Sequence, residues 1–434
     1  MLLPPVFRPR RRSERVCIGT RDRFGLLPVT IPLTRYNTHL YVLGQSGAGK
    51  SKLLQHLLFE LIVRGWGCGL IDPHSDLASD LIAQLHTSGW LAEPANRRRV
   101  IFLDPARRDT LIPANLLACS YATPHQTAEN IVEAFRRVWP DTLREAPRFA
   151  QILRNSLMLL MENHLSLTEL EPLLTDRAFR ARLLARASDP EVIAFFREQY
   201  NRWGREQILM AGPVLNKVSA FLFQPPVRLA LGAAENRLDL RRIMDQGQVL
   251  LADLGGLSGE TQQLYGSLLV TLLEQAAMAR RDTARRRPFF CMIDEFPFFC
   301  ARDPTTLARI LSEVRKFQVF LGLAHQTIAQ TDARMQGALE NAKLKILFGT
   351  GRQTAEALVK ELFMPDLQAV KNEVNAPEAQ ARSHPLFDPM LEQFEVFTQT
   401  IQRLRPRQIL VKLPERERVL RLRTPTVAAS RLAP

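Results

Sequence analysis

The sequence predicts an α/β fold in which a mainly parallel sheet is interrupted by an all-helical insertion. Three observations support this prediction. A glycine-rich GxxxxGKS loop lies between an apolar run and a helical pattern at residues 40–58. Further short apolar runs alternate with helical patterns in the first and last parts of the chain, which is typical of a parallel sheet covered on both faces. Between residues 119 and 225, apolar residues recur at helical spacing without a strand pattern.

The chain begins with a basic segment, residues 1–30, for which we expect a short hairpin over residues 16–30. Its arginines are equally compatible with nucleic-acid contacts and with plain solvation. They are Arg8, Arg10, Arg11, Arg12, Arg15, Arg21 and Arg23.

The glycine-rich loop is a complete phosphate-binding motif in the context that such a loop requires. Its residues are Gly44, Gln45, Ser46, Gly47, Ala48, Gly49, Lys50 and Ser51. The glycines let backbone N–H groups turn towards phosphates, and the N-terminus of the following helix adds a positive dipole at the same point. We expect Lys50 to reach the β- and γ-phosphates and the Ser51 hydroxyl to bind Mg²⁺. The motif therefore predicts a bound nucleoside triphosphate.

Apolar runs after this loop predict the remaining strands. In the first part of the chain, residues 31–118, they lie at residues 67–72 and 100–104. In the last part, residues 226–434, they lie at residues 249–254, 289–294, 319–324 and 345–348, with terminal strands at 409–413 and 419–422. The helical insertion, residues 119–225, separates the two parts. We thus expect one α/β domain, built from both parts, around an inserted helical domain.

The run at residues 289–295 matches a Walker B motif, because four apolar residues are followed by two acids. We expect Asp294 to hold Mg²⁺ through water and Glu295 to orient and deprotonate the attacking water. Two carboxylates at a strand end are costly to bury unless a metal and a nucleophile use them. The alternative is a strand that ends in an ordinary polar turn. The upstream phosphate loop favours Walker B.

Two further polar positions follow strands of the predicted sheet. Gln326 is expected beside the γ-phosphate, where an amide can sense hydrolysis; the alternative is a surface glutamine. Asp72 opens the run Asp72-Pro73-His74-Ser75-Asp76 at a strand end that faces the ligand crevice of an α/β sheet. This run could brace the Mg²⁺ shell, contact a neighbouring subunit, or cap the next turn through Asp72. We interpret His39 and His74 as structural residues.

Phosphoryl transfer also needs positive charge on the γ-phosphate oxygens, which an arginine often supplies. Arg315, between the Walker B strand and the Gln326 strand, is the first candidate. Arg352, after the strand at residues 345–348, is the second. With 58 Lys and Arg residues in the chain, the alternative for either one is a plain surface charge.

Composition limits the function classes further. The 434 residues are 46% hydrophobic and carry a net charge of +14, which suggests a polyanionic partner such as nucleic acid or an anionic membrane, or an arginine-rich source composition. Five cysteines without CxxC pairs argue against a disulfide framework or a zinc site. No run reaches the ~18 apolar residues of a membrane span. We therefore expect a soluble, cytoplasmic protein, peripheral at the inner membrane only through partners.

The motifs together resemble the HerA–FtsK superfamily of ring-forming DNA-pumping ATPases. The resemblance rests on the residues before and within the phosphate loop and on the runs Asp72 to Asp76, Ile293-Asp294-Glu295-Phe296, Arg315-Lys316-Phe317 and Ala324-His325-Gln326. Within the superfamily, the chain is most similar to conjugative coupling proteins of the TraG/TraD type and to related type IV secretion ATPases. These proteins also carry a helical domain between the Walker A and Walker B halves.

The resemblance implies a RecA-like P-loop ATPase fold of the ASCE type, with ATP and Mg²⁺ as ligands. It also implies a homo-hexamer with DNA in a central channel, ATP at the subunit interfaces and Arg315 acting in trans on the neighbouring site. The implied function is an ATP-driven DNA translocase for conjugative transfer, with secretion-channel or relaxosome proteins as partners. The alternatives are a secretion-channel ATPase that powers assembly or protein export without pumping DNA, a HerA-like soluble DNA motor in repair or defence, and an ATP-dependent DNA-binding switch.

Overall fold

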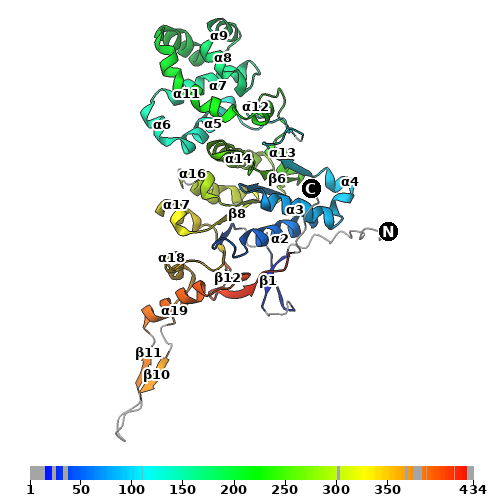
Figure 1. Ribbon diagram of the computed structural model, residues 1–434, viewed down its shortest axis with the longest axis vertical. Coiled ribbons are helices and arrows are strands. Elements are labelled where there is room, and N and C mark those ends of the chain that lie inside the picture. The colour runs from blue at the N-terminus through cyan, green and yellow to red at the C-terminus, as the bar shows by residue number, and fades with distance from the viewer. Residues whose placement is uncertain are drawn as a thin grey trace.

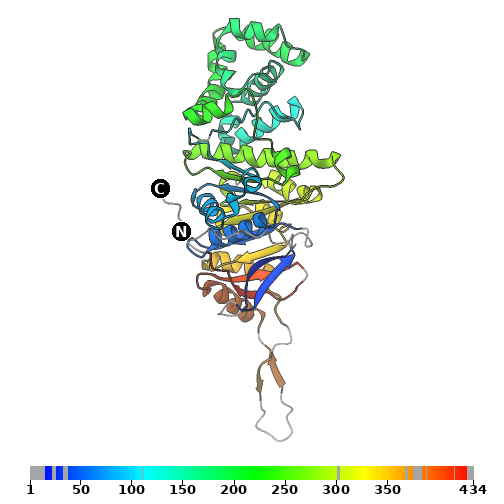
Figure 2. The same ribbon diagram turned by 90° about the vertical axis from the view of Figure 1, so that its right-hand side faces the viewer.

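The computed structural model describes residues 15–21, 26–32, 38–109, 111–300, 304–366, 370–374, 384–387, 389–414 and 416–427. The molecule is elongated (Figures 1 and 2). A helical region lies at one end, a large sheet with flanking helices lies in the middle, and a two-stranded hairpin projects at the other end.

Within the described residues, the central sheet has eleven strands in the order β2-β1-β13-β12-β9-β3-β8-β7-β4-β6-β5. The seven strands from β9 to β5 are mutually parallel. Their bounds are β3 Leu40–Leu43, β4 Gly67–Asp72, β5 Val100–Leu103, β6 Val249–Asp253, β7 Phe289–Ile293, β8 Val319–His325 and β9 Leu344–Leu347. All seven strands predicted for these segments are therefore present.

The order of the strands brings the predicted chemical groups to one edge. Strand β3, which leads into the phosphate loop, lies between β8 and β9, and β7 is the next neighbour of β8. Leu43 is paired with His325, and Ile293 is paired with Leu323. Because parallel strands end at the same edge, the loops that follow β3, β7, β8 and β4 meet there.

Four antiparallel strands extend the sheet beyond β9. They are β12 Gln408–Lys412, β13 Leu420–Arg423, β1 Arg15–Thr20 and β2 Pro28–Pro32. The pairing of β1 with β2 confirms the N-terminal hairpin, and β12 and β13 confirm the terminal strands. Since β1 also pairs with β13, the N-terminal hairpin and the C-terminal strands lie side by side in the sheet.

Helices cover both faces of the sheet. On one face, α2 (Lys50–Val63) and α3 (Asp76–Thr87) pack their leucines against β3, β4 and β1. Burying each such leucine contributes about 1.5–3 kcal/mol. On the other face lie α14 (Gly259–Ala279), α16 (Pro304–Glu313), α17 (Ala333–Leu339) and α18 (Arg352–Leu362). The shorter α4 (Pro94–Arg97), α13 (Leu240–Gln246) and α15 (Pro297–Cys300) join neighbouring elements.

The helical region lies between β5 and β6 in the chain, and Figure 1 shows it stacked beyond α14. Its core is continuous with that of one sheet face, because α5 packs against α14. Its α-helices are α5 Pro124–Val138, α6 Pro140–Glu145, α7 Phe149–Glu162, α8 Leu170–Thr175, α9 Arg177–Leu184, α10 Pro190–Ala194, α11 Glu206–Leu222 and α12 Pro225–Leu231. The helices thus continue to residue 231, past the expected end at residue 225. Its division from the α/β part as a separate domain stays a prediction.

A projecting hairpin was not predicted from the sequence. It is formed by β10 (Val370–Val374) and β11 (His384–Phe387), between α18 and α19 (Met390–Gln402). At its base the rings of Phe363 and Phe397 stack with their centroids 4.2 Å apart. In the part of the chain that the structure describes, no helix combines the length and the apolar character needed to cross a bilayer.

Candidate nucleotide-binding site

The phosphate loop connects β3 to α2 through two residues in the left-handed backbone region. Gly47 has φ 76° and Gly49 has φ 112°. Residues that carry a Cβ rarely adopt these backbone conformations. The loop is braced on its outer side, because the N–H of Gln45 donates to the carbonyl of Gly349 at 3.1 Å. The sequence therefore folds into the open cradle that phosphate binding requires.

Lys50 lies inside this cradle. Its Nζ donates to the carbonyl oxygen of Gly44 at 2.7 Å, and its side chain is buried. Burial lowers the pKa of Lys50, although the nearby carboxylates of Glu295 and Asp294 act in the opposite direction. A buried ammonium that bonds only to carbonyl oxygens of its own loop is well placed to exchange them for phosphate oxygens.

Asp294 and Ser51 form the part of the site that fits a divalent cation. The Ser51 hydroxyl donates to Oδ2 of Asp294 at 3.4 Å, and Asp294 is 4% exposed. Burial raises the pKa of Asp294 to about 6, and the charges of Glu295 and Asp72 add to the effect. The Ser51 hydroxyl and the Asp294 carboxylate are hard oxygen ligands of the kind that Mg²⁺ prefers. A bound cation would offset the energetic cost of ionising the buried carboxyl.

Glu295 follows directly and has an unusual backbone. Its φ is 45°, in the left-handed region, and its N–H donates to Oδ1 of Asp294 at 3.1 Å. Its carboxylate accepts a hydrogen bond from Nε2 of Gln330 at 3.4 Å. A non-glycine residue in this conformation stores strain that the surrounding structure must hold, which is frequent at functional sites.

One open cavity of about 510 Å³ brings these groups together. The phosphate loop, Asp294, Glu295 and Gln326 line it, as do Lys52, Asp72, His74, Asp76 and Leu77. Gln326 immediately follows β8, which lies between the phosphate-loop strand and the Walker B strand. The lining of this cavity includes every predicted site residue except Arg315, Gly44 and Ala48. Gly44 and Ala48 belong to the phosphate loop itself. The chemical roles of all these residues stay predictions.

Asp72 caps a helix, as one of its three interpretations expected. Its two carboxylate oxygens accept from the N–H groups of His74 and Ala78, each at 2.9 Å, so the side chain closes the first turn of α3. Asp72 also lines the cavity, and burial raises its pKa. A role beside Mg²⁺ stays a prediction. His74 is exposed at the cavity rather than packed in the core, and its interpretation as a structural residue stays a prediction.

Arg315 lies at the opposite edge of the sheet. It belongs to the 3₁₀ turn Val314–Phe317, just before β8, whereas the cavity follows the other end of that strand. A seven-residue strand separates them by about 20 Å. The guanidinium of Arg280 donates to the carbonyl of Phe317 at 2.9 Å and fixes the turn. Arg315 is exposed, and its side chain makes no hydrogen bond or ion pair among the described residues. It therefore cannot serve the cavity of its own chain.

The contacts of His39 confirm the prediction that it is a structural residue. Its Nδ1 accepts from the N–H of Leu321 and its Nε2 donates to the carbonyl of Leu311, each at 2.9 Å. Burial lowers its pKa to about 4, so the ring is neutral at physiological pH. The second arginine candidate, Arg352, lies at the cavity edge of the sheet, but its guanidinium is engaged by Glu356 and Glu395.

Sequence reasoning missed two residues that contact the site. Gln330 reaches Glu295, as described above, and the Thr327-x-x-Gln330 capping pattern was the available signal for its fixed position. Arg407 has φ 70°, and its N–H donates to the carbonyl of Ala48 at 3.1 Å, so the segment before β12 braces the phosphate loop. No local sequence pattern predicts the contact between Arg407 and Ala48, because these residues are 359 positions apart.

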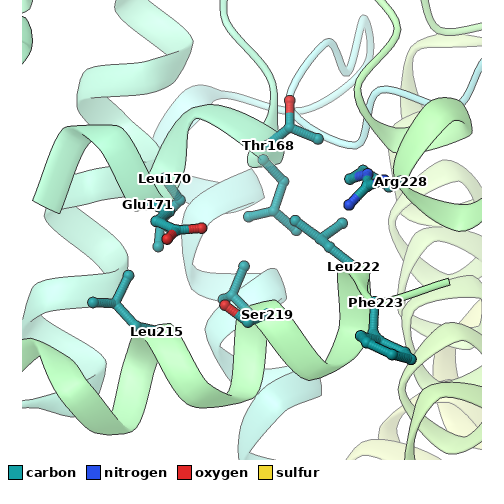
Figure 3. A pocket seen from close by; sticks show the side chains of 10 residues that line it. Thr168, Leu170, Glu171, Leu215, Ser219, Leu222, Phe223 and Arg228 are labelled. Atoms are coloured by element: carbon teal, nitrogen blue, oxygen red, sulfur yellow. The ribbon is translucent and has the colours of Figure 1, made fainter. Parts of the chain in front are cut away.

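A separate cavity lies in the helical region, between α8 and the end of α11 (Figure 3). It measures about 230 Å³, and leucines line much of it, with Glu171 and Arg228 as its charged residues. Its lining includes neither a glycine-rich loop nor a pair of carboxylates. The glycine-rich loop and the Asp294–Glu295 pair lie instead in the cavity at the sheet edge.

Comparison with known proteins identifies the family. The sequence model of the family described as "Helicase HerA, central domain" matches residues 16–273, which is more than half of the chain. The chain belongs to this family. The match covers the phosphate loop and the helical region. A search of curated protein sequences gave no match.

Solved structures share the fold of this HerA-family chain. The bacterial conjugative coupling protein TrwB superposes with a TM-score of 0.59 at 17% identity, over 98% of this chain and 93% of TrwB. TrwB in complex with ADP and Mg²⁺ gives 0.60 at 17% identity, over 98% and 92% of the chains. VirB4 of Thermoanaerobacter pseudethanolicus gives 0.60 at 14% identity, over 95% and 96%. These likenesses confirm the RecA-like P-loop ATPase fold.

The raised pKa of Asp294 leads to a stability prediction. A carboxyl whose pKa is raised from about 4 to about 6 destabilises the folded chain when it ionises, so the cost is absent near pH 4 and complete above pH 6. We expect Asp294→Asn to raise the free energy of unfolding of the ligand-free chain at pH 7.5 by about 3 kcal/mol. Thermal unfolding at pH 7.5 and pH 4 measures this gain, which should vanish at the lower pH. A variant less stable than the wild type at pH 7.5 would contradict the prediction.

Proposed function

We propose that the chain is an ATP-hydrolysing DNA translocase of the conjugative coupling type. The observation that carries the proposal is the single cavity shared by the phosphate loop, the Asp294–Glu295 pair and Gln326. Membership of the HerA family supports it, as do similar structures described as conjugative coupling proteins and as complexes with ADP and Mg²⁺. ATP and Mg²⁺ are the ligands that these residues fit.

Each residue has a defined part in this proposal. The backbone N–H groups of the loop and Lys50 bind the phosphates, and Ser51 and Asp294 hold Mg²⁺. The metal neutralises charge on the β- and γ-phosphate oxygens when it is bound. Glu295 accepts a proton from the attacking water. Gln326 contacts the terminal phosphate. When this phosphate leaves after hydrolysis, the change at Gln326 is transmitted to β8.

Unpaired positive charge supports DNA as the partner. Arg421 and Arg423 of β13 and Arg403, which follows α19, are exposed, and no carboxylate pairs with their side chains among the described residues. Arginines without acidic partners favour contacts to a phosphate backbone, which do not depend on base sequence.

The placement of Arg315 supports a ring. An arginine at the edge opposite the cavity can complete only the site of another copy, which requires a head-to-tail interface. We infer a homo-hexamer from the family resemblance, with Arg315 of each subunit at the neighbouring cavity. Secretion-channel or relaxosome proteins are the partners that this function implies.

Steady-state ATPase activity with and without single- and double-stranded DNA tests the function. We expect stimulation by DNA that weakens steeply between about 50 and 200 mM salt, because binding to phosphates releases counterions. The Lys50→Ala chain is the control and should be inactive throughout. Robust turnover that ignores DNA would instead favour a secretion-channel ATPase that does not pump DNA. No turnover at all would contradict the enzymatic proposal.

A further inference from the structure

The side chain of Gln330 links two groups of the proposed catalytic site. Its Oε1 accepts hydrogen bonds from the N–H groups of Gln326 and Thr327, each at 3.0 Å. Its Nε2 donates to Oε2 of Glu295 at 3.4 Å. Because two backbone donors require an oxygen, the NH₂ group of the amide must face the carboxylate.

The segment that carries Gln330 is tightly held at both ends. Residues 328–330 form a 3₁₀ turn that a capping box between Thr327 and Gln330 closes. Before the turn, the Tyr41 hydroxyl is 2.6 Å from Nε2 of His325, which anchors the end of β8 to the phosphate-loop strand. After the turn, the Thr331 hydroxyl donates to the carbonyl of Ile328 at 2.7 Å. Gln330 is thus fixed although its side chain is exposed.

Glu295 depends on this contact. It is 8% exposed, and Gln330 is the one side chain among the described residues that donates a hydrogen bond to its carboxylate. Its left-handed backbone is a strained conformation that the contacts around it must hold. A general base must point within hydrogen-bond reach of its water, so the direction of this carboxylate affects turnover.

We propose that Gln330 is a positioning residue that couples Gln326 to Glu295. This inference rests on the proposed ATPase function. The amide of Gln330 bonds to the backbone of Gln326 on one side and to the Glu295 carboxylate on the other. When the Gln326 side chain engages or loses the terminal phosphate, a shift of its backbone moves the amide, and the carboxylate follows. Gln330 therefore makes the orientation of the base depend on the state of the nucleotide.

The Gln330→Ala variant tests the coupling. We expect kcat to fall about 10- to 100-fold, because a base misplaced by about 1 Å loses this much. KM and the affinity for a fluorescent ATP analogue with Mg²⁺ should change less than about two-fold, since the phosphate loop, Ser51 and Asp294 are untouched. Gln336→Ala is the matched control. It removes the hydrogen bond from Nε2 of Gln336 to the carbonyl of Thr331, which lies beyond the turn of residues 328–330, and it should keep near wild-type kcat.

A double variant separates positioning from packing. If Gln330 acts through Glu295, adding Gln330→Ala to Glu295→Gln should lower kcat no further, whereas independent effects would multiply. Wild-type kcat in Gln330→Ala, or an equal loss in Gln336→Ala, would overturn the coupling while the ATPase function stands. A wild-type chain that binds the analogue but does not hydrolyse ATP would overturn both.

Discussion

Replacing Glu295 by Gln is expected to separate nucleotide binding from hydrolysis. The substitution keeps the shape of the side chain and an oxygen that can accept from Nε2 of Gln330, so the strained backbone at φ 45° should be retained. It removes the carboxylate that takes a proton from water. Because general-base catalysis contributes about 10²–10⁴-fold, turnover should fall by at least about 100-fold while ATP remains bound.

Single-turnover hydrolysis and ATP binding measured on the same preparation check this result. Glu356→Gln is the matched control, because Glu356 pairs with Arg352 on the surface and lies outside the cavity. It should hydrolyse ATP like the wild type. If Glu295→Gln kept wild-type turnover, Glu295 would not be the base, and an ATP-dependent DNA-binding switch would become the better account.

Replacing Arg315 by Ala is expected to give the largest loss that leaves nucleotide binding intact. An arginine that stabilises charge on a transferring phosphoryl group contributes about 10³–10⁵-fold. Arg315 lies about 20 Å from the cavity of its own chain, so ATP binding should be unchanged. Turnover of the assembled protein should fall about 10³-fold or more. The neighbouring Lys316→Ala is the control for a general loss of charge at this edge.

Mixing two inactive chains tests whether Arg315 acts in trans. A Lys50→Ala chain retains Arg315, and an Arg315→Ala chain retains Lys50. When they are mixed one to one, about a quarter of head-to-tail interfaces should combine the two intact residues. Mixed assemblies should therefore recover up to about a quarter of wild-type turnover. Loss of activity in Arg315→Ala without recovery on mixing would exclude action on a neighbour.

Local patterns predicted the parallel strands and most of the cavity, because each depends on a few adjacent residues. An apolar run followed by Asp294-Glu295 indicates a buried strand with acids at its end whatever its neighbours are. Periodicity alone does not indicate which strands are neighbours. The position of β8 between β3 and β7, which brings Gln326 to the cavity, followed from knowledge of P-loop sheets rather than from this sequence's spacing.

The contacts that escaped prediction are those between distant segments. Gln330 and Glu295 lie on different loops and meet only because β7 and β8 are adjacent. Arg407 contacts the phosphate loop from the antiparallel extension of the sheet. Its positive φ could not be predicted from the sequence, because arginine is not a residue type that favours this conformation. Strands β10 and β11 lack the continuous apolar runs that mark the parallel strands.

The position of β3 also constrains how the chain is made. Its two sheet neighbours, β8 and β9, are encoded about 280 and 300 residues after it. At ribosomal rates of about 5–20 residues per second, roughly 15 to 60 s pass between the synthesis of β3 and that of its neighbouring strands. During synthesis, four consecutive apolar residues, Leu40–Leu43, and the leucines of α2 lack the sheet that later buries them. The nascent protein is therefore a natural client for chaperones that hold exposed apolar segments until translation is nearly complete.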